Sequence, residues 1–321
     1  MLSYVGKRLL ALLPVLFVVS LVIFSLVHIT PGDPAMTILG PEASQKQLAD
    51  LREQLGLNQP LITQYLTWVG GVLTGDFGDS LFLKKPVLTA ITDNLVPTIQ
   101  LALLAQIITV LVAVPLGTLA AKRRGTILDN SVQGFTLIGM AVPSFVLGLI
   151  LVLIFAVALR MLPVAGYVNM FTDPAEGFRY LILPAISLGT VQAAFLTRTT
   201  RAAVLDVLGA DYIDAARSRG VSERRLLFRH SLRNAGLPIL TVIGLSFGGL
   251  VTGAVVTETI FNIPGIGSLL VNSITRRDYA VIQGVVLFTT LVYLTVNLII
   301  DLLYGLVDPR VRLTSSKGAT R

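Results

Sequence analysis

Long runs of apolar residues alternate with polar segments along the whole chain. The apolar runs cover residues 9–27, 97–120, 135–158, 181–196, 237–256 and 280–306. A helix needs about 20 predominantly apolar residues to cross the hydrocarbon core of a bilayer, and most of these runs reach that length. The pattern therefore predicts an all-α polytopic membrane protein with about six transmembrane helices.

The polar segments divide the chain into four regions. Residues 1–28 are expected to form an uncleaved anchor helix, because the sequence that follows lacks the small-residue cleavage site of a signal peptide. Residues 29–96 are expected to form an extracytoplasmic cap, with helical patterns at 43–55 and 61–73 and a turn at 75–80. Residues 97–312 contain the remaining membrane helices, and residues 313–321 are expected to form a disordered cytoplasmic tail.

The composition excludes several classes of protein. Hydrophobic residues make up 54% of the 321 residues and charged residues only 13%, about half the charged share of a soluble domain. Without cysteine and with only two histidines, the chain offers no disulfide, thiolate ligand or multi-histidine metal centre. It also lacks a Gly-x-x-x-x-Gly-Lys-Ser/Thr phosphate loop and any Ser/His/Asp set. We therefore expect no catalytic residue, no metal site and no cofactor in this chain.

The formal net charge of +7 has a topological explanation. About two thirds of the 25 lysines and arginines lie on segments that share the side of the N-terminus, and they are densest between Arg198 and Arg233. Cytoplasmic loops of membrane proteins carry such an excess, so both termini are expected in the cytoplasm. The charge therefore requires no nucleic acid as a partner.

The loop at residues 206–234 has the most informative polar sequence. Its pattern predicts two short helices joined by a hinge. Asp211 and Asp214 are expected to cap the first helix. Gly220 is expected to end that helix in a left-handed conformation, and Ser222 to cap the second helix.

Ala215 and Ala216 keep one face of the first short helix flat, so that another backbone can approach it. From the residues alone, two interpretations stay open: the arginines hold the loop on anionic lipid, or the loop docks on a partner protein. A DNA-reading helix-turn-helix is disfavoured, because membrane helices at both ends give the loop little freedom to enter a major groove.

Asp214-Ala-Ala-Arg-Ser-Arg-Gly220, followed by Leu237-Pro238, resembles the loop motif of permeases of binding-protein-dependent ABC importers. Asp214 replaces the glutamate that usually begins this motif. The chain resembles the dipeptide, oligopeptide and nickel branch of that family over nearly its full length. Matching stretches are Pro31-Gly-Asp-Pro34, Leu55-Gly-Leu57, Gly75-Asp-Phe-Gly78, Pro143-Ser-Phe145, Thr197-Arg-Thr-Thr-Arg201, Arg233-Asn-Ala235, Glu258-Thr-Ile-Phe261, Pro264-Gly-Ile-Gly267 and Asp308-Pro-Arg310.

The resemblance implies a type I importer permease in a bacterial inner membrane. Its implied partners are a second homologous permease, two cytoplasmic ATPase subunits or domains that bind ATP and Mg²⁺, and an extracytoplasmic substrate-binding protein. The implied ATPase-coupling residues are Tyr212, Asp214, Ala215, Ala216, Gly220 and Ser222.

The implied cargo is a short peptide, with nickel chelates, glutathione or another peptide-like solute as alternatives. An ion-coupled secondary transporter is a rival of a different class. Such a transporter normally has ionisable residues at mid-membrane and internal repeats, and neither is evident in this sequence.

Three polar residues in or near the apolar runs are candidates for the translocation pathway or its gate. Glu258 stands at the expected external end of the fifth membrane helix, where an acidic group indicates either function or pairing at the boundary. Gln100 and Gln192 either line a polar path or join helices by hydrogen bonds. Glycines 134, 139, 148, 244, 248 and 249 favour close helix packing.

Overall fold

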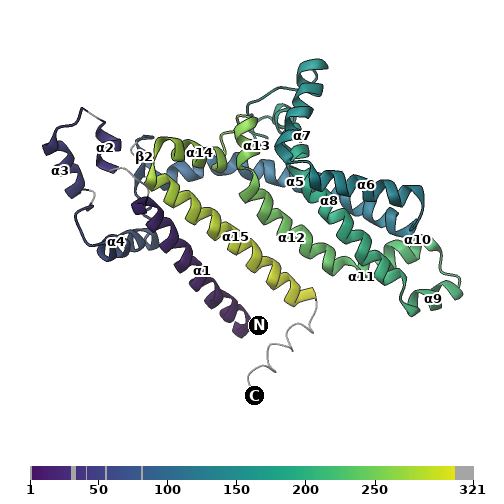
Figure 1. Cartoon of the computed structure of the whole chain (residues 1–321). Coiled ribbons are helices and arrows are strands. Elements are labelled where there is room, and N and C mark those ends of the chain that lie inside the picture. The colour runs from purple at the N-terminus through teal and green to yellow at the C-terminus, as the bar shows by residue number, and fades with distance from the viewer. Residues whose placement is uncertain (1, 30–33, 41, 55, 81, 308–321) are drawn as a thin grey trace. The chain divides into compact units, whose positions relative to one another are not determined.

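The computed structural model describes residues 2–29, 34–40, 42–54, 56–80 and 82–307, and these are mostly helical (Figure 1). The expected tail at 313–321 lies outside the described residues. Two compact units are present: residues 1–96 with 265–292, and residues 97–264 with 293–321. Helices α5 (Val87–Lys122) and α15 (Tyr279–Val307) contribute residues to both units.

The first unit contains short elements around the anchor helix. They are α1 (Leu2–Ile29), α2 (Pro34–Leu39), α3 (Gln45–Gln54), α4 (Leu61–Leu73), the antiparallel pair β1 (Asp79–Ser80) and β2 (Lys85–Pro86), and α14 (Ile266–Arg276). Helix α4 has the predicted bounds, and α3 lies within the predicted 43–55. The apolar pattern does not predict α2 and the hairpin, which are too short to show a period, or α14, which is amphipathic.

Aromatic side chains join α1 to α4. The Ser20 and Tyr65 hydroxyls share a hydrogen bond of 2.8 Å. The Phe24 ring meets the Tyr65 ring edge to face, with centroids 5.4 Å apart at 74°. The Trp68 ring centroid lies 6.1 Å from that of Phe24. These contacts hold the short helix against the anchor, since edge-to-face aromatic pairs add stability beyond the area that they bury.

Helix α5 begins well before the expected Pro97. Val87, Ala90 and Ile91 are fully buried in a cluster to which α14 and α15 contribute Ile266, Leu269, Val281 and Val285. This packing explains why the helix starts early, because burial of an apolar face outweighs the local effect of a proline. The expected boundary between residues 96 and 97 therefore falls inside a continuous helix.

The third expected span, 135–158, is not one continuous helix. Helix α6 (Ile127–Ala141) is followed by α7 (Ser144–Leu151) and the π-helix η1 (Val152–Ala158), with a bend of 101° at the break. Pro143 explains the break, because proline lacks an N–H and restricts the residue before it to extended conformations. Val142 has φ −81° and ψ 120°. The predicted span is therefore present as a bent pair of helices rather than as one helix.

Helix α8 (Pro174–Leu208) is a single helix of 35 residues, much longer than the expected 181–196. Asp173 caps its first turn, where the carboxylate accepts a hydrogen bond of 3.1 Å from the backbone N–H of Glu176. Pro184 lies inside the helix and does not end it. The sequence therefore predicts the position of this span correctly. It does not predict that the helix continues into the polar segments on both sides.

The last two expected spans differ in outcome. Residues 237–256 are divided at Ala254 into α12 (Gly236–Gly253) and α13 (Val255–Ile260). Helix α15 extends the predicted 280–306 by one residue at each end. In the described part of the chain, five helices are long and apolar enough to cross a membrane, and the bent pair makes up to six. The all-α polytopic class is confirmed.

Glycines allow α5 and α8 to pack closely. A Cβ at Gly117 would lie 2.6 Å from the carbonyl oxygen of Thr197, and a Cβ at Gly189 would lie 2.9 Å from that of Ala105. Small residues let helix backbones approach in this way. The prediction of close packing also holds for glycines 139, 148, 244, 248 and 249. It is wrong for Gly134, where a Cβ would meet nothing within 4 Å.

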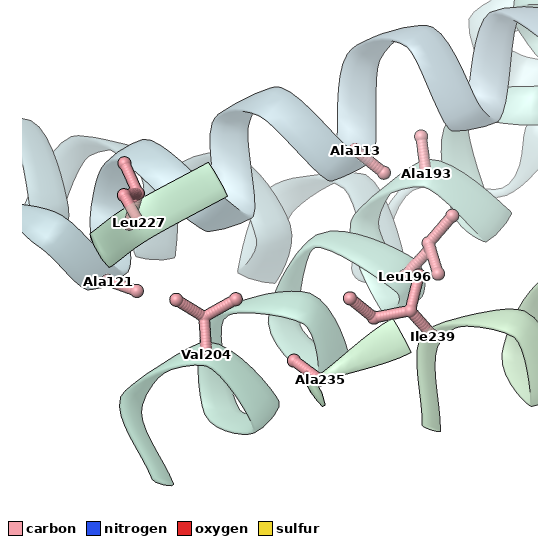
Figure 2. Close-up of a cluster of buried hydrophobic side chains, with 8 residues drawn as sticks. All are labelled: Ala113, Ala121, Ala193, Leu196, Val204, Leu227, Ala235 and Ile239. Atoms are coloured by element: carbon pink, nitrogen blue, oxygen red, sulfur yellow. The ribbon is translucent and has the colours of Figure 1, made fainter. Parts of the chain in front are cut away.

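The hydrophobic core beside this contact is built largely from alanines and β-branched residues. Figure 2 shows side chains of α5, α8, η2 (Leu226–Ser231), α12 and the residue just before α12 pointing toward one another. They are Ala113, Ala121, Ala193, Leu196, Val204, Leu227, Ala235 and Ile239. The core therefore ties the 206–234 loop to the ends of two membrane helices.

Candidate functional site

The 206–234 loop folds into a chain of short helices between α8 and α12. They are α9 (Asp211–Ser218), α10 (Glu223–Arg225), the π-helix η2 and α11 (Leu232–Asn234). Figure 1 shows α9 at the end of α8 that lies away from α7. The two predicted short helices are present, although the second one is irregular.

Gly220 ends α9 in the way that the sequence predicts. Its φ is +80°, in the left-handed region that favours glycine. The Gly220 N–H donates to the Arg217 carbonyl at 2.9 Å, and the Val221 N–H donates to the Ala216 carbonyl at 3.2 Å. Together these bonds form a Schellman motif, which satisfies the last carbonyls of the helix. The prediction of a left-handed hinge is confirmed.

The predicted caps of this loop are not formed by side chains. The N-cap of α9 is Ala210, so Asp211 lies in the first turn and caps nothing. Asp214 accepts a hydrogen bond of 2.6 Å from Arg217 Nη1. Ser222 occupies the N-cap position of α10, but its side chain makes no capping bond. Both carboxylates still lie at the positive end of the α9 dipole, where negative charge is favourable.

Three apolar side chains anchor the loop. Ile213 and Leu226 are fully buried, and Leu227 belongs to the cluster in Figure 2. The Asn234 amide donates to the Tyr212 hydroxyl at 2.7 Å, which links α9 to α11 across the loop. The loop is therefore seated on the helices by its own core.

The face of α9 opposite the buried Ile213 is exposed. Asp211, Ala215 and Ser218 are exposed and lie three to four residues apart, so they share one face of the helix. Ala216 is half-buried, because it lies on the side of Ile213. Of the two alanines that the sequence selects, Ala215 is the more exposed.

Arg217 stiffens the junction between α9 and α10. Its guanidinium donates to Glu223 Oε1 at 2.8 Å and to Asp214 Oδ1 at 2.6 Å. The hydrogen bond that Arg217 donates to Glu223, together with the attraction of the Glu223 and Asp214 charges, raises the pKa of Arg217. The arginine therefore bridges the first helix and the start of the second.

The predicted pathway residue Gln100 is buried among protein partners. Its Nε2 donates to Asn169 Oδ1 at 2.8 Å, while its Oε1 accepts from the Tyr167 hydroxyl at 2.9 Å and the Met170 N–H at 3.2 Å. Gln100 therefore fixes the 159–173 segment to α5.

Glu258 has no exposed surface, and its Oε1 accepts a hydrogen bond of 2.6 Å from the Thr98 hydroxyl. Thr98 and Gln100 are neighbours on α5, so two of the three pathway candidates attach to the same stretch of helix. Gln192 lies elsewhere: a Cβ added at Gly249 on α12 would lie 3.3 Å from the Gln192 Nε2 atom. Gln100 and Glu258 thus have partners on or beside α5, whereas Gln192 faces α12.

Asp129 and Arg201 form an ion pair that the sequence analysis missed. Arg201 Nε and Nη2 donate to the two Asp129 oxygens at 2.6 and 2.9 Å. Asp129 is 1% exposed and also accepts from the Gly125 N–H at 2.9 Å. The sequence feature that indicates such a pair is an acidic residue close to an apolar run, because this group needs a partner. The pair joins α6 to the end of α8 that leads into the loop.

The family described as the binding-protein-dependent transport system inner membrane component matches residues 113–313, and its N-terminal region matches residues 1–102. The chain belongs to this family. The expected resemblance is thereby confirmed, and the chain is a multi-pass permease subunit of an inner membrane, not an enzyme. Permeases of this family act in transporter complexes with ATPase and substrate-binding partners.

Relatives of this permease match almost its full length. The probable peptide ABC transporter permease protein y4tP of Sinorhizobium fredii (strain NBRC 101917 / NGR234) is 45% identical over 309 residues, which cover 96% of this chain and 99% of the relative. The glutathione transport system permease protein GsiC of Escherichia coli (strain K12) is 41% identical over 312 residues, which cover 97% and 99%.

A crystal structure of an amino acid ABC transporter with histidines has a similar fold. Its TM-score is 0.50 at 17% identity, and the match covers 67% of this permease and 93% of that chain. At this identity the similarity supports the fold alone.

Proposed function

We propose that this permease combines with a second permease, two ATPase subunits and an extracytoplasmic binding protein to import short peptides. Both named relatives support this cargo, since one is a probable peptide permease and the other transports glutathione, which is itself a short peptide. Nickel chelates and other peptide-like solutes are the alternatives within the same machinery.

The observation that carries the coupling role is the exposed face of α9 on a rigidly seated loop. Ala215 leaves that face flat between Asp211 and Ser218, while Ile213 holds the other side against the protein. A helix that is fixed on one side and exposed on the other can transmit a push from a docked partner. In this proposal the ATPase subunits bind ATP and Mg²⁺, and α9 docks in a groove on one of them.

Transport would proceed by alternating access. Closure of the ATPase subunits on ATP displaces α9, and the attached membrane helices tilt as rigid bodies. Helix α8 continues to within two residues of α9, and the Asp129–Arg201 pair links α8 to α6. Displacement of α9 therefore reaches at least two membrane helices through direct contacts.

Glu258, Gln100 and Gln192 remain our candidates for the pathway or gate. Glu258 and Gln100 attach α13 and the 159–173 segment to α5 through hydrogen bonds. A gate needs such bonds to form in one state and break in another. Thr98→Val, which removes the hydroxyl that Glu258 accepts from, should therefore change the rate of uptake more than the binding of cargo to its receptor.

The cargo is tested by reconstituting the complete transporter in vesicles with its binding protein. We expect ATP-dependent uptake of labelled dipeptides, oligopeptides or glutathione, and no ATP hydrolysis by the purified permease alone. Uptake driven by an ion gradient without ATPase subunits would instead establish a secondary transporter. Uptake of nickel chelates but not peptides would retain the machinery and refute the peptide cargo.

The coupling role is tested by placing tryptophan on the exposed face of α9. Ala215→Trp should leave the permease inserted and abundant but lower both uptake and co-purification of the ATPase subunits at least tenfold. Thr172→Trp is the matched control, because Thr172 is exposed and lies far from the loop in the chain. Full attachment and uptake in Ala215→Trp would show that α9 is not the docking helix.

A further inference from the structure

A basic hollow lies on the second half of the 206–234 loop, and of its lining residues only Ser222 is among the ATPase-coupling residues that the resemblance implies. It has a volume of about 440 Å³ and is lined by Ser222, Arg224, Arg225, Phe228 and Arg229. The hollow is shallow and largely open to its surroundings. All five residues are exposed, and the Phe228 side chain is 53% exposed.

The arginines of this hollow differ from Arg217 in the same loop. Arg217 is paired with two carboxylates, whereas no ion pair joins Arg224, Arg225 or Arg229 to any acidic residue in the described part of the chain. Arg225 and Arg229 lie four residues apart, as do Arg224 and Phe228, so each pair shares a helix face. Three cations around one concave surface make a site for an anion with several oxygens.

Two apolar helices that are long enough to cross a membrane have an end close to the hollow. Leu227 packs with Ala121, after which α5 ends at Lys122 (Figure 2). Helix α12 starts only a few residues after the hollow, and its 18 residues span about 27 Å, so it needs its whole length to cross a core of about 30 Å. Two membrane helices therefore end close to this surface.

We propose that the hollow binds the phosphate headgroup of an anionic lipid. The arginines would hold the phosphate, Ser222 would donate a further hydrogen bond, and the exposed Phe228 ring would lie in the interfacial layer, as aromatic residues do at membrane boundaries. Half of the loop then rests on the membrane while α9 faces the ATPase. The lipid would act as a support against which α9 is pushed.

The exposed aromatic ring favours lipid over the ATPase as the occupant. A ring exposed beside arginines at the end of membrane helices matches the aromatic and basic residues that mark lipid interfaces. The proposed ATPase-facing surface on α9 instead carries an acidic residue, a serine and an alanine.

The test uses the purified full-length permease in detergent and adds short-chain phosphatidylglycerol or short-chain phosphatidylcholine. Phosphatidylglycerol should raise the melting temperature by several degrees and remain bound in native mass spectrometry, whereas phosphatidylcholine should do neither. Equal effects of the two lipids on the wild-type protein would overturn the proposal without the need for a variant.

Replacing Arg224, Arg225 and Arg229 by glutamine should weaken phosphatidylglycerol binding by on the order of 100-fold, since each arginine near a lipid surface contributes roughly a fivefold change. The matched control replaces Lys122, Arg123 and Arg124 by glutamine, which removes the same charge near the end of α5 outside the hollow. A comparable loss in the control would show a general charge effect and refute the site. Loss of ATPase co-purification with lipid binding intact would assign the hollow to the partner protein instead.

Discussion

Gly220 shows how one backbone conformation determines the shape of the 206–234 loop. Its φ of +80° closes α9, and the bonds from Gly220 and Val221 secure the carbonyls that the helix leaves behind. A Cβ at this position would meet nothing within 4 Å, so the requirement for glycine comes from the backbone and not from crowding. Substitutions of Gly220 therefore test the backbone conformation of the loop without introducing a steric clash.

We therefore predict different results for two substitutions of Gly220. Gly220→Val should be strained by about 1–2 kcal/mol in the left-handed conformation, which would misdirect α9 and abolish uptake. Gly220→Asn should keep most of the uptake, because asparagine adopts this conformation more readily. The measurement is substrate uptake with ATPase co-purification at matched expression. Similar activity of the two variants would argue against a role for the hinge.

The Asp129–Arg201 pair allows a second prediction at this scale. Asp129→Ala leaves the half-buried Arg201 without its carboxylate and removes the partner of the Gly125 N–H. We expect the free energy of unfolding to fall by about 2 kcal/mol. This is less than the usual cost of breaking a buried ion pair, because Arg201 is partly exposed. The control is Asp93→Ala, which breaks the more exposed pair with Lys85 and should cost less than about 1 kcal/mol. Thermal unfolding of the Asp129→Ala and Asp93→Ala variants in detergent measures the difference in stability.

At the scale of helices, glycines let α5 and α8 pack closely. A Cβ at Gly117 would collide with both the backbone oxygen of Thr197 and the side chain of Thr200. Such contacts leave no space for even one additional methyl group. Their effect on stability is therefore steric, in contrast to that of Gly220.

Gly117→Val should destabilise the permease by about 1–3 kcal/mol, because a larger side chain would force two helices apart. Gly134→Val is the control, since its Cβ meets nothing within 4 Å. We expect a clear drop in melting temperature for the first variant and little change for the second. An equal drop in both would mean that valine acts through helix propensity alone.

The sequence predicts the number and type of these helices well because apolar length is a local property. Helix α4 and α15 match their predicted bounds closely, and the left-handed Gly220 follows from the local pattern. The early start of α5, in contrast, depends on Ile266 and Val281, which are distant in sequence. Likewise, the partners of Glu258 and Asp129 depend on helix packing, which no spacing along the chain reveals.

At the scale of the whole molecule, we predict that both termini lie in the cytoplasm. The chain has no cysteine, so single cysteines can report the side of each loop. Cysteines that replace Gln47 or Thr172, both exposed, should react with an impermeant thiol reagent in intact cells. The exposed Ser222 position should react only after the membrane is opened. Labelling of Ser222→Cys from outside would reverse the topology.

Helix α8 also has a mechanical consequence. Its 35 residues form a rod about 52 Å long, which exceeds the hydrocarbon core of about 30 Å. A rod of this length acts as a lever arm: a rotation of about 6° about one end moves the other end by about 5.4 Å, the pitch of one helical turn. In the proposed mechanism, α9 therefore needs to move by only about one helical pitch to tilt α8 by several degrees.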